Sequence, residues 1–204
     1  MFIITADQID SSHLSDKAAS ALGELTERYA SELVLPVDRN AGDEIQALVA
    51  SGAAALAIIT DLTRTGDWSV GCGIGAVRTP LPGTTREATG PGFVAARAAV
   101  ERAKKAPLRF ALSGAAPQEV AGVEALIDLL LLTRSRRSPE GWELFDLIAR
   151  GMTQAEAASA LGITPQAASQ RARAAGIRPE IAAVPALAAA LSRLDGAGEQ
   201  NGIT

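Results

Sequence analysis

The chain has 204 residues, 48% of them hydrophobic and 21% charged, so it can bury a sizeable core in one large domain or two small ones. Its single cysteine and single histidine exclude an intrachain disulfide and a Cys/His zinc site. The net charge of −4 argues against indiscriminate nucleic-acid binding. With no signal peptide at its start and no apolar run of membrane-spanning length, we expect a soluble, cytoplasmic protein without a membrane partner.

The first half of the chain alternates short apolar runs with helical patterns. We expect strands at 2–6, 33–39, 44–49, 68–77 and 108–113, and helices at 14–31, 53–64 and 93–105. The first six of these elements run strand, helix, strand, strand, helix, strand. That order predicts an α+β fold, a ferredoxin-like sandwich with helices on one face of an antiparallel sheet.

Three glycines at every second position interrupt the strand expected at 68–77: Gly71, Gly73 and Gly75. They do not form a dinucleotide fingerprint, because they lie inside a strand and no helix follows at once. Glycine within a strand more often marks a bulge or a close approach of another backbone.

The second half is expected to be all helical. A linker at 114–121 precedes a strongly apolar helix at 123–132, which must pack on the first domain or on a second copy of the chain. A hinge at 134–139 precedes a helix at 140–150, and an Ala/Leu helix follows at 181–194. The expected division is a first domain at 1–115, a helical linker at 116–138, a helix-turn-helix domain at 139–195 and a flexible tail at 196–204.

The sequence predicts that a helix-turn-helix begins at Thr153. With Glu156 this residue forms a capping box, in which two backbone N–H groups at the helix start are satisfied reciprocally. Apolar residues are then expected to share one face of the first helix: Ala155, Ala158 and Leu161. The supporting helix at 140–150 would contribute its own core residues: Trp142, Phe145 and Ile148.

The turn and the second helix carry equally clear signals. Gly162 supplies the positive φ needed to leave the first helix, Thr164 caps the second, and Pro165 takes its first turn. Short polar residues near the start of such a helix reach base edges in the major groove, and arginines suit phosphates. The residues expected to contact DNA are Thr164, Gln166, Ser169, Gln170, Arg171 and Arg173. The alternative is a helical hairpin that only packs.

Charge is unevenly distributed along the chain. The segment 134–178 contains seven arginines and four acidic residues, a net charge of +3, so the remainder of the chain carries −7. A basic segment attached to an acidic body is typical of a DNA-reading domain joined to another module.

Two aspartates are expected to meet at one end of the sheet. Asp7 follows the first strand, and Asp43 lies at the tip of the hairpin between the second and third strands. In a ferredoxin-like sheet the first and third strands are antiparallel neighbours, so the end of one meets the beginning of the other. Two carboxylates beside a glycine turn suit Mg²⁺ carrying a nucleotide phosphate. A loop cap and a hairpin turn explain the same aspartates without a ligand.

Four ordered motifs resemble the SatD family: Ala6–Ser12, Gly42–Gln46, Gly71–Gly75 and Gly90–Ala98. Proteins of that family join such a first domain to a C-terminal helix-turn-helix. The same landmarks look like a reduced class III nucleotidyl cyclase or GGDEF core. That resemblance implies that Asp7 and Asp43 bind metal, and that Gly42, Glu44 and Arg97 contact a nucleotide.

The chain departs from the cyclase pattern in ways that disfavour turnover. Phe93 occupies the place of the ribose-orienting Asn, four residues before Arg97, and the base-selecting Lys/Asp pair has no counterpart. We therefore expect a DNA-binding regulator, dimeric on its DNA, whose degenerate cyclase-like domain senses a ligand or drives dimerisation. The alternatives are a metal-dependent nucleotidyl cyclase-like enzyme and a self-assembling structural protein.

Overall fold

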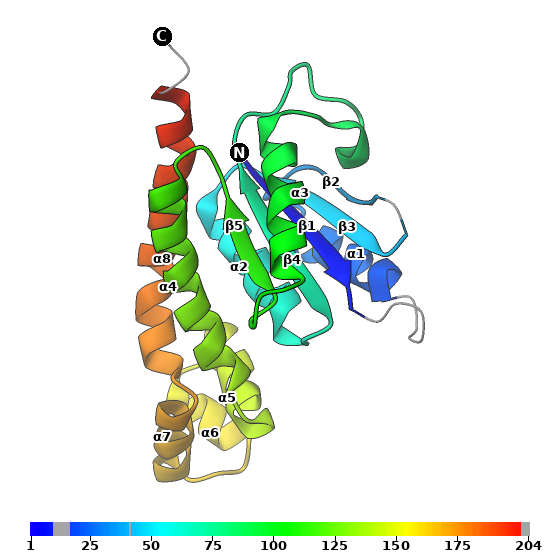
Figure 1. Ribbon diagram of the computed structural model, residues 1–204. Helices are drawn as coiled ribbons and strands as arrows, with labels where there is room; N and C mark the ends of the chain where they lie inside the picture. The colour runs from blue at the N-terminus through cyan, green and yellow to red at the C-terminus, as the bar shows by residue number, and fades with distance from the viewer. Residues whose placement is uncertain (10–16, 41, 201–204) are drawn as a thin grey trace. The chain divides into compact units, whose positions relative to one another are not determined.

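A computed structural model describes residues 1–9, 17–40 and 42–200 (Figure 1). The chain divides into two compact units. The sheet unit contains Met1–Asp128 together with the segment from Ala186 onward, and the helical unit contains Leu129–Pro185. The fold is α+β, as the sequence predicts.

The sheet unit is built on a five-stranded mixed sheet with the order β2-β3-β1-β4-β5. Its strands are β1 (Phe2–Gln8), β2 (Leu33–Arg39), β3 (Glu44–Val49), β4 (Trp68–Ile74) and β5 (Phe110–Ser113). Neighbouring strands are antiparallel except β4 and β5, which are parallel. All five expected strands are present, and two of them have the predicted bounds.

Helices cover both faces of this sheet (Figure 1). The helices that precede β5 are α1 (Lys17–Arg28), α2 (Gly52–Arg64) and α3 (Pro91–Ala103), with a short 3₁₀ turn, η1 (Thr85–Glu87), before α3. Trp68 of β4 faces α1 and α2, whereas Gly71 of the same strand faces α3. Because successive strand residues point to opposite faces, α1 and α2 share one face and α3 lies on the other. Residues 14–16 of the expected first helix lie outside the described residues.

The glycine run of β4 allows α3 to approach the sheet backbone to backbone. A Cβ built on Gly73 would lie 2.2 Å from the backbone nitrogen of Ala96, and one built on Gly71 would lie 2.2 Å from that of Val100. Alanines on α3 complete this packing, with Ala96 and Ala99 fully buried. The interpretation of the run as a close backbone approach is confirmed.

The remaining helices are α4 (Pro117–Ser135), α5 (Pro139–Ala149), α6 (Gln154–Ala160), α7 (Pro165–Ala174) and α8 (Ile177–Gln200). The expected linker at 114–121 is wrong, because α4 already begins at Pro117. Proline fits there because its missing N–H costs nothing in the first turn of a helix. The expected loose tail is also wrong as far as Gln200, where α8 ends. Residues 201–204 lie outside the described residues.

No single helix among the described residues is long and apolar enough to cross a membrane. Among those residues, only the bent pair of helices at 165–174 and 177–196 reaches the required length and apolarity when the two are taken together.

Candidate functional site

The start of α6 has the geometry predicted from its sequence. The backbone N–H of Thr153 donates to Oε2 of Glu156 at 2.7 Å, and the backbone N–H of Glu156 donates to Oγ1 of Thr153 at 3.2 Å. The backbone hydrogen bond from Thr153 lowers the pKa of the Glu156 carboxyl. The capping box is confirmed, so the first turn of α6 is fixed by side chains of its own sequence.

The connection between α6 and α7 is also as predicted. Gly162 leaves α6 with φ of +64°, a conformation that costs glycine little. The hydroxyl of Thr164 accepts a hydrogen bond from the backbone N–H of Ala167 at 3.1 Å, and Pro165 follows in the first turn of α7. Local side chains therefore set both the end of α6 and the beginning of α7.

Small residues bring α5, α6 and α7 together around one core. The buried members of this core are Leu144, Ala157, Ala172, Ala175 and Ile177, with Phe145, Ile148 and Leu161 packed against them. The prediction for Ala155 is wrong, because this residue is exposed and the inner face of α6 is formed by Ala157 and Ala158. The side chain at the centre of α5 is Leu144, whereas Trp142 is only half-buried.

The outer face of α7 is polar. Gln166, Gln170 and Arg173 are exposed, and Ser169 between them is half-buried. Their spacing places them on one side of the helix, opposite the buried Ala168 and Ala172. Thr164, at the start of the helix, is exposed as well. The structure thus brings four of the six expected DNA contacts to one face, with Thr164 at the N-terminal end of the helix.

Arg171 is the exception among the expected contacts. Its guanidinium lies 3.8 Å from the carboxylate of Glu143 on α5, and its side chain is 25% exposed. In helical geometry Arg171 is two positions from Arg173, which places the two side chains on different sides of α7. Arg171 therefore lies beside the polar face of α7 and not on it.

A buried charge network that the sequence did not predict supports the polar face of α7. Arg134, Arg137 and Glu180 are each less than one-tenth exposed. Arg134 is paired with Glu180, and Nη2 of Arg137 lies 2.5 Å from Oε2 of the same carboxylate. Nε of Arg137 also donates to the carbonyl oxygen of Ala175 at 3.0 Å, just after α7 ends.

An aromatic ring completes this network. The guanidinium carbons of Arg134 and Arg137 lie 4.8 Å and 4.4 Å from the centre of the Trp142 ring, within cation–π range. Two of the seven arginines in the basic segment therefore face inward and hold α4, α5 and α8 together within the helical unit. The basic charge available at the surface is smaller than the sequence count indicates.

A second polar cluster lies on the α3 face of the sheet unit. In the register of β1 and β3, Asp7 lies directly opposite Glu44. Nη1 of Arg97 on α3 lies 2.6 Å from Oε2 of Glu44, whose side chain is only 4% exposed, and Nδ2 of Asn40 donates to the other carboxylate oxygen at 2.6 Å. Lys104, just after α3, lies 3.3 Å from Asp7.

These contacts do not fit a metal site. Asp7 and Glu44 each have a cationic partner from the α3 region, so no carboxylate of the pair is left without a counter-charge. Within the described residues no group of three His, Cys, Asp or Glu side chains is placed to hold a metal ion. Asp43 is half-buried and precedes β3, and Gly42 forms the turn before it. The cluster is built as a set of internal ion pairs.

Phe93, four residues before Arg97 on α3, is part of a hydrophobic cluster. Its side chain packs with the fully buried Ile3, Leu48 and Ala96. The residue that replaces the sugar-orienting amide of the cyclase pattern thus belongs to a hydrophobic cluster between α3 and the sheet.

Comparisons with models of protein families, with curated proteins and with solved structures found no match to this chain.

Proposed function

We propose that the protein is a DNA-binding regulator that reads the major groove with α7, the second helix of a helix-turn-helix formed by α6 and α7. The observation that carries the proposal is the outer face of α7, where Gln166, Gln170 and Arg173 are exposed on one side of a helix whose other side is buried alanine. Gln binds adenine through two hydrogen bonds, and Arg binds phosphate or guanine.

The packing of the helical unit supports this role. The caps at Thr153 and Thr164 fix where both helices begin, and the Arg134–Glu180–Arg137 network fixes the supporting helices. A recognition helix must be held rigidly, since a displacement of about 1 Å already lengthens hydrogen bonds to base edges beyond their useful range.

The sheet unit is proposed as the regulatory part, with a ferredoxin-like arrangement related to the cyclase-like domain of the SatD family. The order β2-β3-β1-β4 supports this classification. Mg²⁺ and a nucleotide are not part of the proposal, because Lys104 already pairs with Asp7, Glu44 already holds Arg97, and the described residues contain no group of three metal-ligating side chains. The enzyme alternative is disfavoured for the same reason.

We further propose that two copies bind one DNA site. A single helix-turn-helix makes few contacts, and dimers read half-sites about 34–36 Å apart. Leu126 and Leu129 on α4 are 50% and 62% exposed and offer an apolar surface for a second copy. Light scattering with and without DNA tests this point, since a monomeric mass in both states would contradict it.

Selection from a random-sequence duplex library tests the function. The wild-type protein should enrich a defined motif, and the double variant Gln166→Ala/Gln170→Ala should enrich a different or degenerate one. The matched control is Gln118→Ala, which makes the same change at an exposed glutamine of α4 outside the helical unit and should leave the motif unchanged. Identical motifs from the double variant and the wild type would contradict the proposal.

A further inference from the structure

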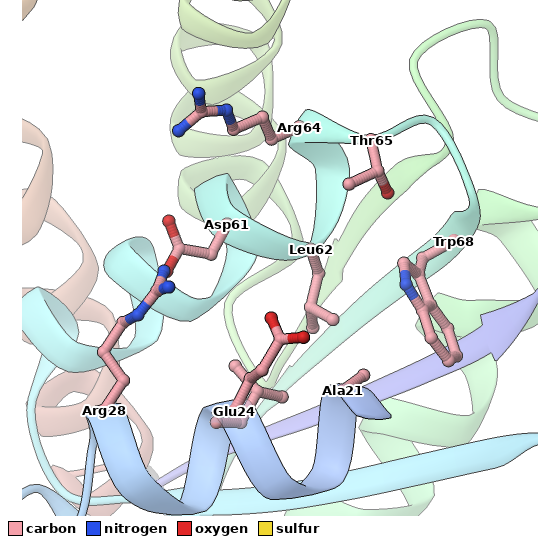
Figure 2. A pocket seen from close by; sticks show the side chains of 9 residues that line it. Ala21, Glu24, Arg28, Asp61, Leu62, Arg64, Thr65 and Trp68 are labelled. Atoms are coloured by element: carbon pink, nitrogen blue, oxygen red, sulfur yellow. The ribbon is translucent and has the colours of Figure 1, made fainter. Parts of the chain in front are cut away.

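The sheet unit contains a cavity that the proposed reading of DNA does not use. It lies between α1 and α2, beside the start of β4, and has a volume of about 190 Å³ (Figure 2). That volume is smaller than the roughly 300–1,000 Å³ of pockets for drug-sized ligands, so an occupant must be small.

The walls of the cavity are apolar. Leu25 of α1 and Leu62 of α2 line it, and the indole ring of Trp68 forms one side. All three side chains are less than one-tenth exposed, so they form a firm apolar lining. Figure 2 shows the nitrogen-bearing edge of Trp68 on the side of the ring that faces Leu62. An apolar or aromatic body of matching size would fit against these groups.

The cations at the cavity are directed elsewhere. Nη1 of Arg28 lies 2.5 Å from Oδ2 of Asp61, and the hydroxyl of Tyr29 donates to the same oxygen at 2.7 Å. Burial, with the charge of Asp61, raises the pKa of Tyr29, so its hydroxyl stays protonated as a donor. Figure 2 shows the guanidinium of Arg64 directed away from the cavity.

Glu24 is the second acidic residue that lines the cavity. Figure 2 shows the carboxylate of Glu24 projecting from α1 toward Leu62. Its hydrogen-bond donor is the hydroxyl of Ser20 at 2.9 Å, and Arg28, one turn further along α1, interacts with it through charge alone because its guanidinium is paired with Asp61. Asp61, on the opposite helix, is already paired with Arg28 and Tyr29, which leaves Glu24 as the carboxylate for an occupant. The charge that meets an occupant is therefore that of a carboxylate.

We propose that this cavity binds a small amphipathic amine, with its apolar body between Leu25, Leu62 and Trp68 and its ammonium group on Glu24. Glu24 would repel an anion, and a neutral ligand would gain no charge-assisted hydrogen bond from it. The role of the cavity as the effector site of a DNA-binding regulator rests on the proposed function, whereas the binding of an amine does not.

Three ligands of the same size test the charge preference: 2-phenylethylamine, 2-phenylethanol and phenylacetate. Each is titrated at pH 7.5 into full-length protein carrying Trp142→Phe, so that Trp68 is the remaining tryptophan and reports binding by its fluorescence. The amine should bind about tenfold more tightly than the alcohol, as a charge-assisted hydrogen bond of about 1.5 kcal/mol requires. Phenylacetate should bind more weakly than either. No saturable change with the amine, or tighter binding of phenylacetate, would overturn the proposal.

Two variants separate recognition from folding. Glu24→Gln keeps the size of the side chain and should erase the preference for the amine over the alcohol, while both still bind. Glu27→Gln on the exposed part of the same helix is the matched control and should keep the preference. An unchanged preference in Glu24→Gln would overturn the assignment of the ammonium site.

The regulatory role is tested separately, by measuring the affinity for a selected duplex with and without the amine. A change in DNA affinity that Glu24→Gln abolishes supports an effector site. Unchanged DNA affinity at a saturating amine concentration overturns the regulatory role and leaves amine binding standing. Absence of DNA binding under all conditions instead contradicts the proposed function, since amine binding is measured without DNA.

Discussion

Replacing Glu180 with glutamine should destabilise the helical unit strongly. The substitution keeps the shape of the side chain but removes the carboxylate that pairs with both Arg134 and Arg137. All three groups are buried, so two guanidiniums inside the unit would lose the carboxylate that they share. Breaking a buried ion pair from one side costs about 3–5 kcal/mol.

That loss is large for a unit of this size. At roughly 0.05–0.15 kcal/mol per residue, the free energy of unfolding of residues 129–185 is at most about 9 kcal/mol. The variant should therefore keep only a part of the stability of the helical unit, while the sheet unit keeps its own. With a denaturant slope of about 1 kcal/mol per M of urea, the unfolding midpoint should fall by about 3–5 M.

Urea unfolding followed by the fluorescence of Trp142 measures this effect locally, because the ring lies against both guanidiniums. Trp68→Phe in all samples removes the other tryptophan. The matched control is Glu143→Gln, which removes an exposed carboxylate 3.8 Å from Arg171 and should change the free energy of unfolding by less than about 1 kcal/mol. Equal midpoints for the Glu180 and Glu143 variants would show that the buried carboxylate stabilises the helical unit no more than an exposed one.

Three further predictions concern the fold. Gly73→Ala places a Cβ 2.2 Å from the backbone nitrogen of Ala96, so α3 must move. We expect thermal unfolding to show that the free energy of unfolding falls by about 1–3 kcal/mol. The control is Gly83→Ala, whose Cβ meets no atom within 4 Å and which should show no comparable fall. Thr153→Ala removes the capping box and should cost about 1 kcal/mol in urea unfolding; an unchanged midpoint would mean that the cap contributes nothing. Burial raises the pKa of the Cys72 thiol to about 12, so the native protein at pH 8 should react with a thiol reagent only as fast as it opens, and rapid native labelling would contradict that burial.

Local signals account for what the sequence predicted well. The hairpin strands at 33–39 and 44–49 have the predicted bounds, because a turn and apolar runs fix both ends within a few residues. The caps at Thr153 and Thr164 were equally predictable, since each depends on residues at most three positions apart. The glycine run of β4 indicated a close approach, although the sequence did not identify α3 as its partner.

Long-range pairing explains what the sequence missed. The partner of Asp7 across the sheet is Glu44, which depends on the β1–β3 register, and the ion pairs to Arg97 and Lys104 depend on where α3 lies. Arg134 and Arg137 looked like surface charge because Glu180, more than forty residues away, carries no local signal of burial. Gly, Ala and Pro residues made 114–121 resemble a linker, whereas Pro117 starts α4.

The salt dependence of DNA affinity, measured for Arg173→Ala and Arg171→Ala on one selected duplex, tests the central claim most directly. We expect Arg173→Ala to weaken binding to all sequences and to reduce the slope of log affinity against log salt concentration by about 1. Arg171→Ala should leave that slope near the wild-type value, because Arg171 lies toward Glu143 and away from the outer face of α7. Wild-type affinity and slope in Arg173→Ala would contradict the claim that this face of α7 binds DNA.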